Sequence, residues 1–316
     1  MKRHFIFAAL MCAMAPSMAA DYPAKPIKLI SGYATGGSVD LAARAFAKHL
    51  GEELKQTVVV ENRSGASGLI AASSTAKSAA DGYTLYFAVG ATFTVMPTIN
   101  QDAEVKALDE LAPIGGIVDY TNILLVNKTV PASNLDELIA YAKANPEAIT
   151  YGSSGIGSSS HLSGEYFRQL TGAPMTHVPY RGAAPAMMDV IGGQISLFFD
   201  VTATAQGHVK GGKVKPLAVA SKHRNAMFPN VPSVAELGYA DYEVTSWYGL
   251  FAPKAVPASV SETLNKALTA VRNNPEFQEQ MRLSGYEMFT GGAQDVNARI
   301  EKEKQLWKTV LSGAQS

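Results

Sequence analysis

Apolar and polar positions along the chain predict strands and helices in alternation. Residues 26–31 have the pattern of a buried strand. Residues 38–50 place apolar side chains near helical spacing, and the β-branched run 57–61 predicts a second strand. A helix of small residues over 68–77 and a strand over 83–88 follow. This order predicts an α/β fold with a parallel sheet and helices on its faces.

A second unit repeats the order farther along the chain. Its expected strands are 123–126, 148–153, 175–179, 195–199 and 216–220, and its expected helices are 135–144, 159–170 and 183–191. Three more helices are expected around 258–272, 275–283 and 294–311. The length agrees with two units, on a prior of about 150 residues per domain.

Two stretches, beginning at residues 125 and 251, share a pattern. Each is a strand, then Val-Pro-Ala-Ser, then a helix that stops before Asn-Pro-Glu. The pattern is a common way to begin a helix, because proline in the first turn loses no hydrogen bond. The alternative interpretation is that the chain crosses here between two lobes. Lobe one would then be residues 21–123 plus 247–316, and lobe two residues 124–246.

Residues 1–20 have a different character from the rest of the chain. A basic start precedes the apolar run 5–15, and small residues follow. This order is typical of a secretory signal peptide, and the run is too short to span a membrane. We expect cleavage after Ala19 or Ala20. A lipoprotein anchored through Cys12 is the competing interpretation, disfavoured because a bulky methionine precedes the cysteine where a small residue is expected.

Removal of that segment changes the charge and the cysteine content. The whole chain has 27 basic and 27 acidic residues, and the segment contains two of the basic residues, no acidic one and the only cysteine. Near-neutral charge gives no general electrostatic reason to bind nucleic acid or an anionic membrane. No later apolar stretch approaches about 20 residues, so we expect export to the periplasm without membrane insertion.

Two segments share a layout of strand, Gly/Ser-rich loop and helix start. The first loop is 33–38 and the second is 153–161. Glycine lets the backbone approach a ligand closely, and a helix N-terminus offers unpaired N–H groups with a partial positive charge. Each loop alone is also an ordinary connection with a serine cap. Because both follow predicted parallel strands, where α/β folds bind ligands, the pair favours a shared cleft.

The loops indicate the kind of anion. Neither contains Lys or Arg, and neither matches the phosphate-binding pattern G-x-x-x-x-G-K-[ST]. Residues 155–160 break the dinucleotide pattern G-x-G-x-x-G at its last position. Backbone donors and hydroxyls without cations suit a carboxylate better than a triphosphate. We therefore expect a small carboxylate ligand and no cofactor.

A few individual side chains are further candidates, each with an alternative role. Arg181 follows a predicted strand and either reaches the cleft or pairs with an acid. Asp200 ends an apolar strand as a cleft residue or a helix cap. Trp247 and Tyr248 lie on the expected return crossing, where they either close over a ligand or pack in the core. His161 is expected in the first turn of a helix, and a hydrolase using a loop serine and His161 is the enzyme alternative.

The sequence lacks the common motifs of hydrolases and metal enzymes, which disfavours the hydrolase alternative. The chain has no G-x-S-x-G elbow and no H-E-x-x-H motif. His161 and Glu165 are four residues apart, but two side chains are too few to indicate a metal site. We expect a binding protein that is not an enzyme and holds no metal.

Several motifs together resemble a known family. They are Tyr22–Ile27, Gly36–Asp40, Val60–Ala66, Asp81–Leu85, His177–Gly182, Pro229–Glu236 and Ser246–Gly249. In this order they are similar to the Bug-type receptors, the extracytoplasmic solute-binding proteins of tripartite tricarboxylate transporters. The resemblance implies a two-lobed, type II periplasmic-binding-protein-like fold with a ligand cleft and two crossing segments. It implies membrane transporter subunits as partners, and a membrane sensor protein is the alternative partner.

The resemblance also implies the ligand and its contacts. A di- or tricarboxylate or an aromatic carboxylate is expected. One carboxylate would lie against Tyr33, Ala34, Thr35, Gly36, Gly37 and Ser38 of the first loop, and Ser153, Gly155, Gly157, Ser158, Ser159 and His161 of the second. The rest of the ligand would lie near Gly90, Tyr180, Asp200 and Trp247, with Arg181 as a further candidate. The family's usual proline-rich, aromatic run before Gly-Gly is absent here, so the resemblance does not name the acid.

Overall fold

The computed structural model describes residues 22–100 and 103–313, so the predicted signal peptide lies outside the described residues. The strands are β1 (Ile27–Ser31), β2 (Val58–Asn62), β3 (Thr84–Val89), β4 (Leu111–Val126), β5 (Thr150–Ser153), β6 (Thr176–Pro179), β7 (Leu197–Val201), β8 (Lys215–Val219), β9 (Thr245–Pro253) and β10 (Glu287–Met288). They form one sheet of order β2-β1-β3-β9-β4-β7-β5-β6, with β8 and β10 also pairing with β4.

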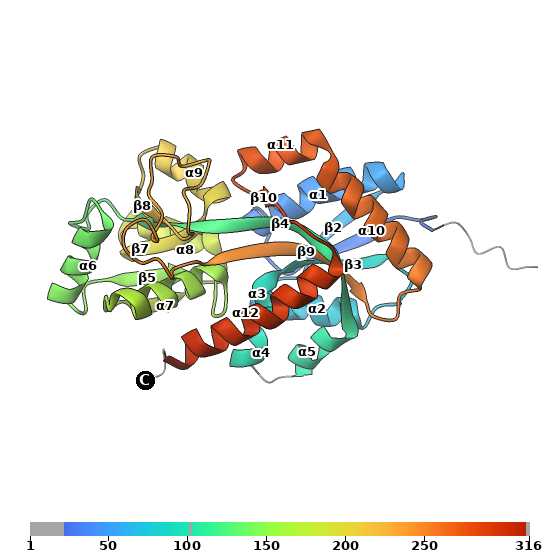
Figure 1. The fold of residues 1–316 in the computed structure, drawn as a ribbon, viewed down its shortest axis with the longest axis horizontal. Helices are drawn as coiled ribbons and strands as arrows, with labels where there is room; N and C mark the ends of the chain where they lie inside the picture. The colour runs from blue at the N-terminus through green and yellow to red at the C-terminus, as the bar shows by residue number, and fades with distance from the viewer. Residues whose placement is uncertain (1–21, 101–102, 314–316) are drawn as a thin grey trace, which may run out of the picture.

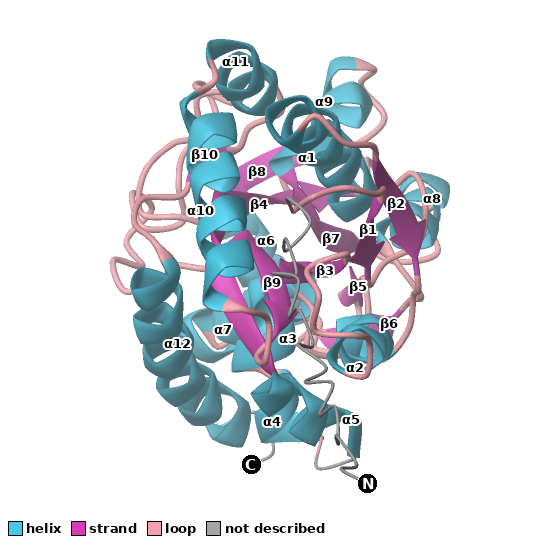
Figure 2. Ribbon diagram, turned by 90° about the vertical axis from the view of Figure 1, so that its right-hand side faces the viewer, coloured by secondary structure: helices cyan, strands magenta, loops and turns pink. Residues whose placement is uncertain are grey.

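Helices cover both faces of this sheet. They are α1 (Ser38–Leu54), α2 (Leu69–Ala76), α3 (Gly90–Thr94), α4 (Met96–Ile99), α5 (Ala103–Lys106), α6 (Leu135–Ala144), α7 (Ser159–Thr171), α8 (Ala183–Gly192), α9 (Thr202–Lys210), α10 (Ala258–Asn273), α11 (Pro275–Leu283) and α12 (Ala293–Gly313), with 3₁₀ turns at Ala66–Gly68 and Ala107–Glu110. Figure 2 shows α1 and α10 on one side of β1 and β3, and α2 on the other. The α/β class and every expected helix and strand are confirmed, with ends shifted by a few residues except at β4, which begins at Leu111 where the sequence predicts a strand only over 123–126.

The parallel pairing that the alternation of strands and helices predicts is confirmed within two groups of strands, and two further strands run antiparallel to them. β1 is parallel to β2 and β3, and β5 is parallel to β6 and β7, but β4 and β9 run antiparallel to their neighbours. The sequence pattern missed most of β4 because Pro113, Gly115 and Gly116 interrupt its apolar run. The pairing of β4 with β9 shifts register at those residues, as it does at a β-bulge.

β4 and β9 join two lobes, and Figure 1 shows them running side by side between the two groups of helices. Residues 111–121 of β4 pair with β9, whereas residues 122–126 pair with β7 and β8. β1, β2 and β3 lie at one end of the sheet, and β5 and β6 lie at the other. Helix α12 contacts α3 and α7, which belong to different lobes. The boundaries expected from the sequence, residues 21–123 plus 247–316 and residues 124–246, stay a prediction.

The shared Val-Pro-Ala-Ser pattern has two different structures. Pro257 is the N-cap of α10. Pro131 lies ahead of the α6 N-cap, Asn134, whose side chain accepts a hydrogen bond from the Glu137 N–H at 2.9 Å. The helix begins directly after the proline only in the second stretch, at Pro257. In the first stretch the helix begins later, because Asn134 supplies a side-chain cap. The two Val-Pro-Ala-Ser segments therefore come directly after the crossing strands β4 and β9 and are not part of them.

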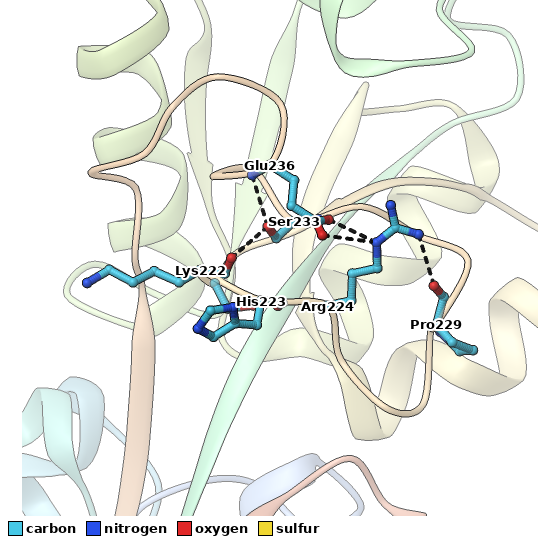
Figure 3. Close-up of polar contacts among 7 residues, drawn as sticks. Lys222, His223, Arg224, Pro229, Ser233 and Glu236 are labelled. Atoms are coloured by element: carbon cyan, nitrogen blue, oxygen red, sulfur yellow. Dashed lines mark hydrogen bonds and ion pairs between the residues drawn. The ribbon is translucent and has the colours of Figure 1, made fainter.

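The connection from β8 to β9 contains no helix, and polar contacts fix its path (Figure 3). Arg224 Nε lies 2.9 Å from the Glu236 carboxylate, and Arg224 also donates to the Pro229 carbonyl at 3.1 Å. The Glu236 N–H donates to Ser233 Oγ at 3.1 Å, and the Ser233 N–H donates to the Glu236 carboxylate at 2.9 Å. This reciprocal pair has the form of a capping box. It orders the segment that returns the chain to β9.

Candidate functional site

A cavity lies between the two lobes and against the crossing strands. Its wall includes Tyr33–Thr35, Gly37–Val39, Val89, Tyr120, Asn122, Ser154, Ser158–Ser160, Arg181–Pro185, Phe198–Val201 and Tyr248. The cavity volume is about 100 Å³. This space exceeds the roughly 10–15 Å³ that a single water needs, so the cavity has room for a small organic solute.

The N-termini of three helices meet at this cavity. The first turns of α1, α7 and α8 contribute Gly37–Val39, Ser158–Ser160 and Gly182–Pro185 to its wall. The N-caps of α1 and α8 are Gly37 and Gly182, and neither places a side chain over the first N–H groups. Helix N-termini carry unpaired donors and partial positive charge, so this convergence favours an anion. Arg181 adds a positive side chain to the same wall.

The Asp40 carboxylate holds the first loop in place through hydrogen bonds. Its Oδ2 accepts a hydrogen bond from the Gly36 N–H at 2.9 Å, and its Oδ1 accepts one from Asn62 Nδ2 at 2.9 Å. Asn62 also donates to the Tyr33 carbonyl at 2.9 Å, and Arg44 Nε donates to Asp40 at 3.0 Å. Burial alone would raise the pKa of Asp40, but these donors lower it below its usual value. The loop is therefore tied to an ionised carboxylate, which also suits the N-terminus of α1.

Hydroxyl groups hold the second loop in the same way. Ser158 Oγ donates to the Gly155 carbonyl at 2.6 Å and lies 2.9 Å from Ser160 Oγ. Ser160 Oγ accepts a hydrogen bond from the Ser154 N–H at 2.9 Å. Gly155 has a φ of +127°, which L side chains rarely adopt. Both loops are thus shaped by internal bonds, and a ligand needs little further ordering of them.

Buried polar groups form the part of the wall beside the crossing strands, which we call the inner wall (Asn122, Asp200 and Tyr248). Asp200 is 2% exposed, and its Oδ1 accepts hydrogen bonds from the Val201 N–H and the Thr204 hydroxyl, both at 2.9 Å. Burial raises the pKa of Asp200 to about 7, although these two bonds lower it. Of the two roles open to it in the sequence, Asp200 takes that of a cavity residue, because the N-cap of α9 is Val201 and no side chain caps that helix.

The other two members of the inner wall have unpartnered atoms. Asn122 Nδ2 donates to Ser163 Oγ at 3.0 Å, whereas Asn122 Oδ1 has no hydrogen-bond partner among the described residues. The same holds for the Tyr248 hydroxyl, within the described part of the chain. Asn122 and Tyr248 are 1% and 0% exposed, so water outside the protein does not reach them. The inner wall thus differs chemically from the helix N-termini.

The cavity brings together many of the residues expected from the sequence. Those on its wall are Tyr33, Ala34, Thr35, Gly37, Ser38, Ser158, Ser159, Arg181 and Asp200. Gly155 and Tyr180 line a second, more open cavity, which shares Tyr33, Ala34 and Arg181 with the first. Gly36 and Gly157 shape the two loops without lining either cavity. Whether these residues contact a ligand stays a prediction.

Trp247 and Gly90 lie away from the cavity. Trp247 is fully buried, and its Nε1 donates to Glu303 at 3.3 Å. A Cβ on Gly90 would lie 2.5 Å from the Trp247 ring, so the glycine makes room for the indole. Because successive side chains of a strand point to opposite faces, the next residue, Tyr248, lines the cavity in its place. For Trp247 the structure shows the packing alternative.

His161 and Ser153 are also turned away from the cavity. His161 Nδ1 accepts a hydrogen bond from the Gly157 N–H at 3.2 Å, and its ring lies 4.4 Å from that of His177. Burial lowers the pKa of His161, and burial with the neighbouring His161 lowers the pKa of His177 to about 4. Ser153 Oγ lies 2.7 Å from His177 Nε2 but is fully buried. Within the described ranges, no group of three His, Cys, Asp or Glu side chains is placed to hold a metal ion.

The sequence reasoning missed parts of this wall. Tyr120 and Asn122 lie on the crossing strand that the apolar pattern did not reveal. The start of α8 had a local signal, because Gly182 stands between a strand and a helix as the glycines of the two loops do. That third instance of the layout marks the third helix N-terminus at the cavity.

The family of receptors described as "Tripartite tricarboxylate transporter family receptor" matches residues 42–314. The chain belongs to this family. Protein BugT of Bordetella pertussis is 34% identical over 313 residues, covering 97% of this chain and 94% of BugT. R. palustris Rpa4515, solved with adipate, is 32% identical with a TM-score of 0.89, covering 93% and 99% of the two chains. Periplasmic binding protein BugD is 34% identical with a TM-score of 0.86, at the same coverage.

This receptor family consists of solute-binding proteins, and the solved members share the two-lobed fold. The resemblance to Bug-type receptors and the expected two-lobed, periplasmic-binding-protein-like fold are therefore confirmed. The receptor has no helix, within residues 22–100 and 103–313, that is long and apolar enough to cross a membrane.

Proposed function

We propose that this receptor captures a small carboxylic acid outside the cytoplasm and delivers it to the membrane subunits of a tripartite tricarboxylate-type transporter. The observation that carries the proposal is the convergence of the α1, α7 and α8 N-termini on one cavity between the lobes. First-turn N–H groups would bind the carboxylate, and Arg181 would add a charge-assisted hydrogen bond. The adipate bound to Rpa4515 supports an acid of similar size.

The periplasm is the proposed location. The leader-like residues 1–20 support it, as does the likeness to the periplasmic binding protein BugD. The proposed lobes, residues 21–123 plus 247–316 and residues 124–246, would close over the acid and exclude water from it. Exclusion of water strengthens each hydrogen bond to the carboxylate. No catalytic step is part of the proposal.

Calorimetry with mono-, di- and tricarboxylates, aromatic acids and neutral sugars tests the proposal, and we expect binding of at least one acid. Gly37→Leu should abolish it. A Cβ at Gly37 meets only the Ala34 carbonyl, at 3.7 Å, so the backbone tolerates the change while the longer side chain fills the cavity. Gly192→Leu is the matched control, because Gly192 is exposed and a Cβ there meets nothing within 4 Å. Binding of a sugar and of no acid would overturn the proposal.

Delivery to the transporter needs a separate measurement. Loaded receptor immobilised on beads should retain the transporter's membrane subunits from detergent-solubilised membranes more strongly than unloaded receptor. Retention of a sensor protein in place of those subunits would contradict the transport role and support the sensor alternative.

A further inference from the structure

The second, more open cavity continues the first one outward. The two share Tyr33, Ala34, Ser154 and Arg181, so their walls are continuous. The second is the larger, at about 680 Å³ against about 100 Å³. Lobe one contributes α4 and the turn of residues 64–67 to its wall, and lobe two contributes the second loop and the end of β6. An acid too long for the first cavity therefore has space to extend into the second.

The wall of the second cavity carries little charge. Among the described residues that line it, Arg181 is the only charged one, and it stands where the two cavities meet. Met96, Ile99 and Ile156 contribute apolar side chains beyond that point. Ile156 is 55% exposed, so much of its side chain is free to contact a ligand. The first cavity, by contrast, collects the helix N-termini, which favour an anion.

The contacts of the second loop hold these apolar side chains on one wall. The Ile156 carbonyl accepts a hydrogen bond from Ser67 Oγ at 2.7 Å, across the two lobes. A Cβ on the next residue, Gly157, would lie 3.0 Å from both Met96 Sδ and Ile99 Cδ1, so the loop packs closely on α4. Ile156 of lobe two is thereby fixed on the same wall as Met96 and Ile99 of lobe one. This wall is ordered before any ligand reaches it.

The polar groups of this wall are largely engaged within the protein. The Tyr180 hydroxyl donates to Asp189 at 2.6 Å, and the Ser67 hydroxyl is used by the bond to the second loop. A charged group in the second cavity would lose part of its hydration and find Arg181 as its one ionic partner among the described residues of the wall. An apolar group would instead leave water for contact with aliphatic side chains, which is favourable.

We propose that the second cavity binds the far end of the solute and that this end is uncharged and apolar. The carboxylate of the solute lies at the helix N-termini, and an alkyl or aryl chain passes Arg181 into the second cavity. This inference rests on the proposed function and narrows its substrate class to monocarboxylic acids with an extended apolar chain. Rpa4515, by contrast, was solved with a dicarboxylate, adipate.

Three acids test the inference on the unaltered protein. Butyrate is short, octanoate has a longer apolar chain, and adipate is similar in size to octanoate but ends in a second carboxylate. Calorimetry should show octanoate binding about tenfold or more tightly than butyrate, because part of its longer chain leaves water in the second cavity. Octanoate should also bind more tightly than adipate, whose second carboxylate loses hydration beside an apolar wall.

Ile156→Asp then assigns the preference to the second cavity. The substitution puts a charge on the apolar wall and keeps the backbone carbonyl that Ser67 bonds. We expect octanoate to lose about tenfold or more in affinity and butyrate to be nearly unchanged. Butyrate is thus an internal control for lobe closure, which both acids require. Leu283→Asp is the matched variant, because Leu283 is 59% exposed at the end of α11 and lines neither cavity; it should leave all three affinities unchanged.

The outcomes separate the inference from the proposed function. If octanoate binds no more tightly than butyrate, or keeps its advantage in Ile156→Asp, its chain does not lie in the second cavity and the inference is wrong. The inference is also wrong, and the proposed function stands, if adipate binds most tightly. Equal weakening of butyrate and octanoate by Ile156→Asp would assign the residue to closure and overturn the inference. If no acid of any length binds, the proposed function itself fails.

Discussion

Asp200 shows how burial without a counterion alters one side chain. Asp200 lies on the cavity wall but is almost fully buried, and loss of water disfavours its charged form more than two hydrogen bonds favour it. The result is a pKa near 7 in a residue that is fully ionised at that pH when exposed. The unliganded protein therefore holds a proton on Asp200 under conditions where the unfolded chain does not.

This difference links the stability of the unliganded receptor to pH. The folded state binds the Asp200 proton up to about pH 7, whereas the unfolded chain releases it near pH 4. The contribution of Asp200 to the free energy of unfolding should be largest below pH 4 and should fall as the pH rises to 7. Urea unfolding at pH 5 and pH 7.5 should show a steeper loss of stability for the wild type than for Asp200→Asn. Parallel pH profiles of the two proteins would contradict the raised pKa.

At the scale of elements, one strained turn lines the second, more open cavity. Ala66 and Ser67 have φ values of 46° and 49°, and such left-handed conformations cost about 1–2 kcal/mol per L residue. The Thr92 hydroxyl donates to the Ser67 carbonyl at 2.8 Å and holds the turn in place. Ser67 Oγ then donates to the Ile156 carbonyl of the second loop at 2.7 Å. The turn thus connects an element of lobe one to an element of lobe two.

We expect this bond to favour lobe closure and hence ligand binding. Ser67→Ala keeps a Cβ on the strained backbone and removes only the hydroxyl. If the bond forms only when the lobes close, its loss should weaken ligand binding by about two- to tenfold, as expected for one neutral hydrogen bond of about 0.5–1.5 kcal/mol. Calorimetry measures the affinity, and a thermal melt of the unliganded protein should be nearly unchanged. Ser74→Ala, which removes a hydroxyl bonded within α2, is the control. If Ser67→Ala and Ser74→Ala bind the ligand equally tightly, the hydrogen bond from Ser67 to Ile156 does not contribute to closure.

Elements defined by local pattern could be predicted from the sequence, and elements defined by distant pairing could not. The starts of α1 and α7 were predictable because glycines and serines lie directly between a strand and an apolar helix. β4 was missed over most of its length because its glycines and proline fit a strand only through pairing with β9. The short helices α3, α4 and α5 are too brief for an apolar period to show.

The inner wall escaped prediction for a whole-molecule reason. Asn122, Asp200 and Tyr248 come from three strands far apart in the sequence, and they meet because β4 pairs with both β7 and β9. No spacing along the chain records that meeting. Trp247 was chosen over Tyr248 because the sequence does not say which face of β9 looks toward the cavity. Long-range strand order decides the face, and the fold alone supplies it.

The charge of the whole molecule has a final consequence for binding. The full chain is balanced at 27 basic and 27 acidic residues, so no strong net field draws an acid toward the cavity from a distance. Attraction has to come from the helix N-termini and Arg181 at short range, where salt screens weakly because the Debye length is about 10 Å at 0.1 M. We therefore expect the dissociation constant of the bound acid to change by less than about threefold between 0.05 and 0.5 M ionic strength.

Calorimetry in sodium chloride and in sodium sulfate, matched in ionic strength, measures this salt dependence. Screening depends on ionic strength alone, so equal curves in the two salts show screening, whereas a difference between them shows an anion competing for the cavity. Arg181→Gln should remove most of the residual salt dependence, because it removes the exposed cation of the wall. The contrary result is an affinity that falls tenfold or more with rising ionic strength in both salts, and falls as much in Arg181→Gln. It would mean that surface charges beyond the cavity attract the ligand. Local binding by backbone donors would then be an insufficient account of how a neutral receptor holds an anion.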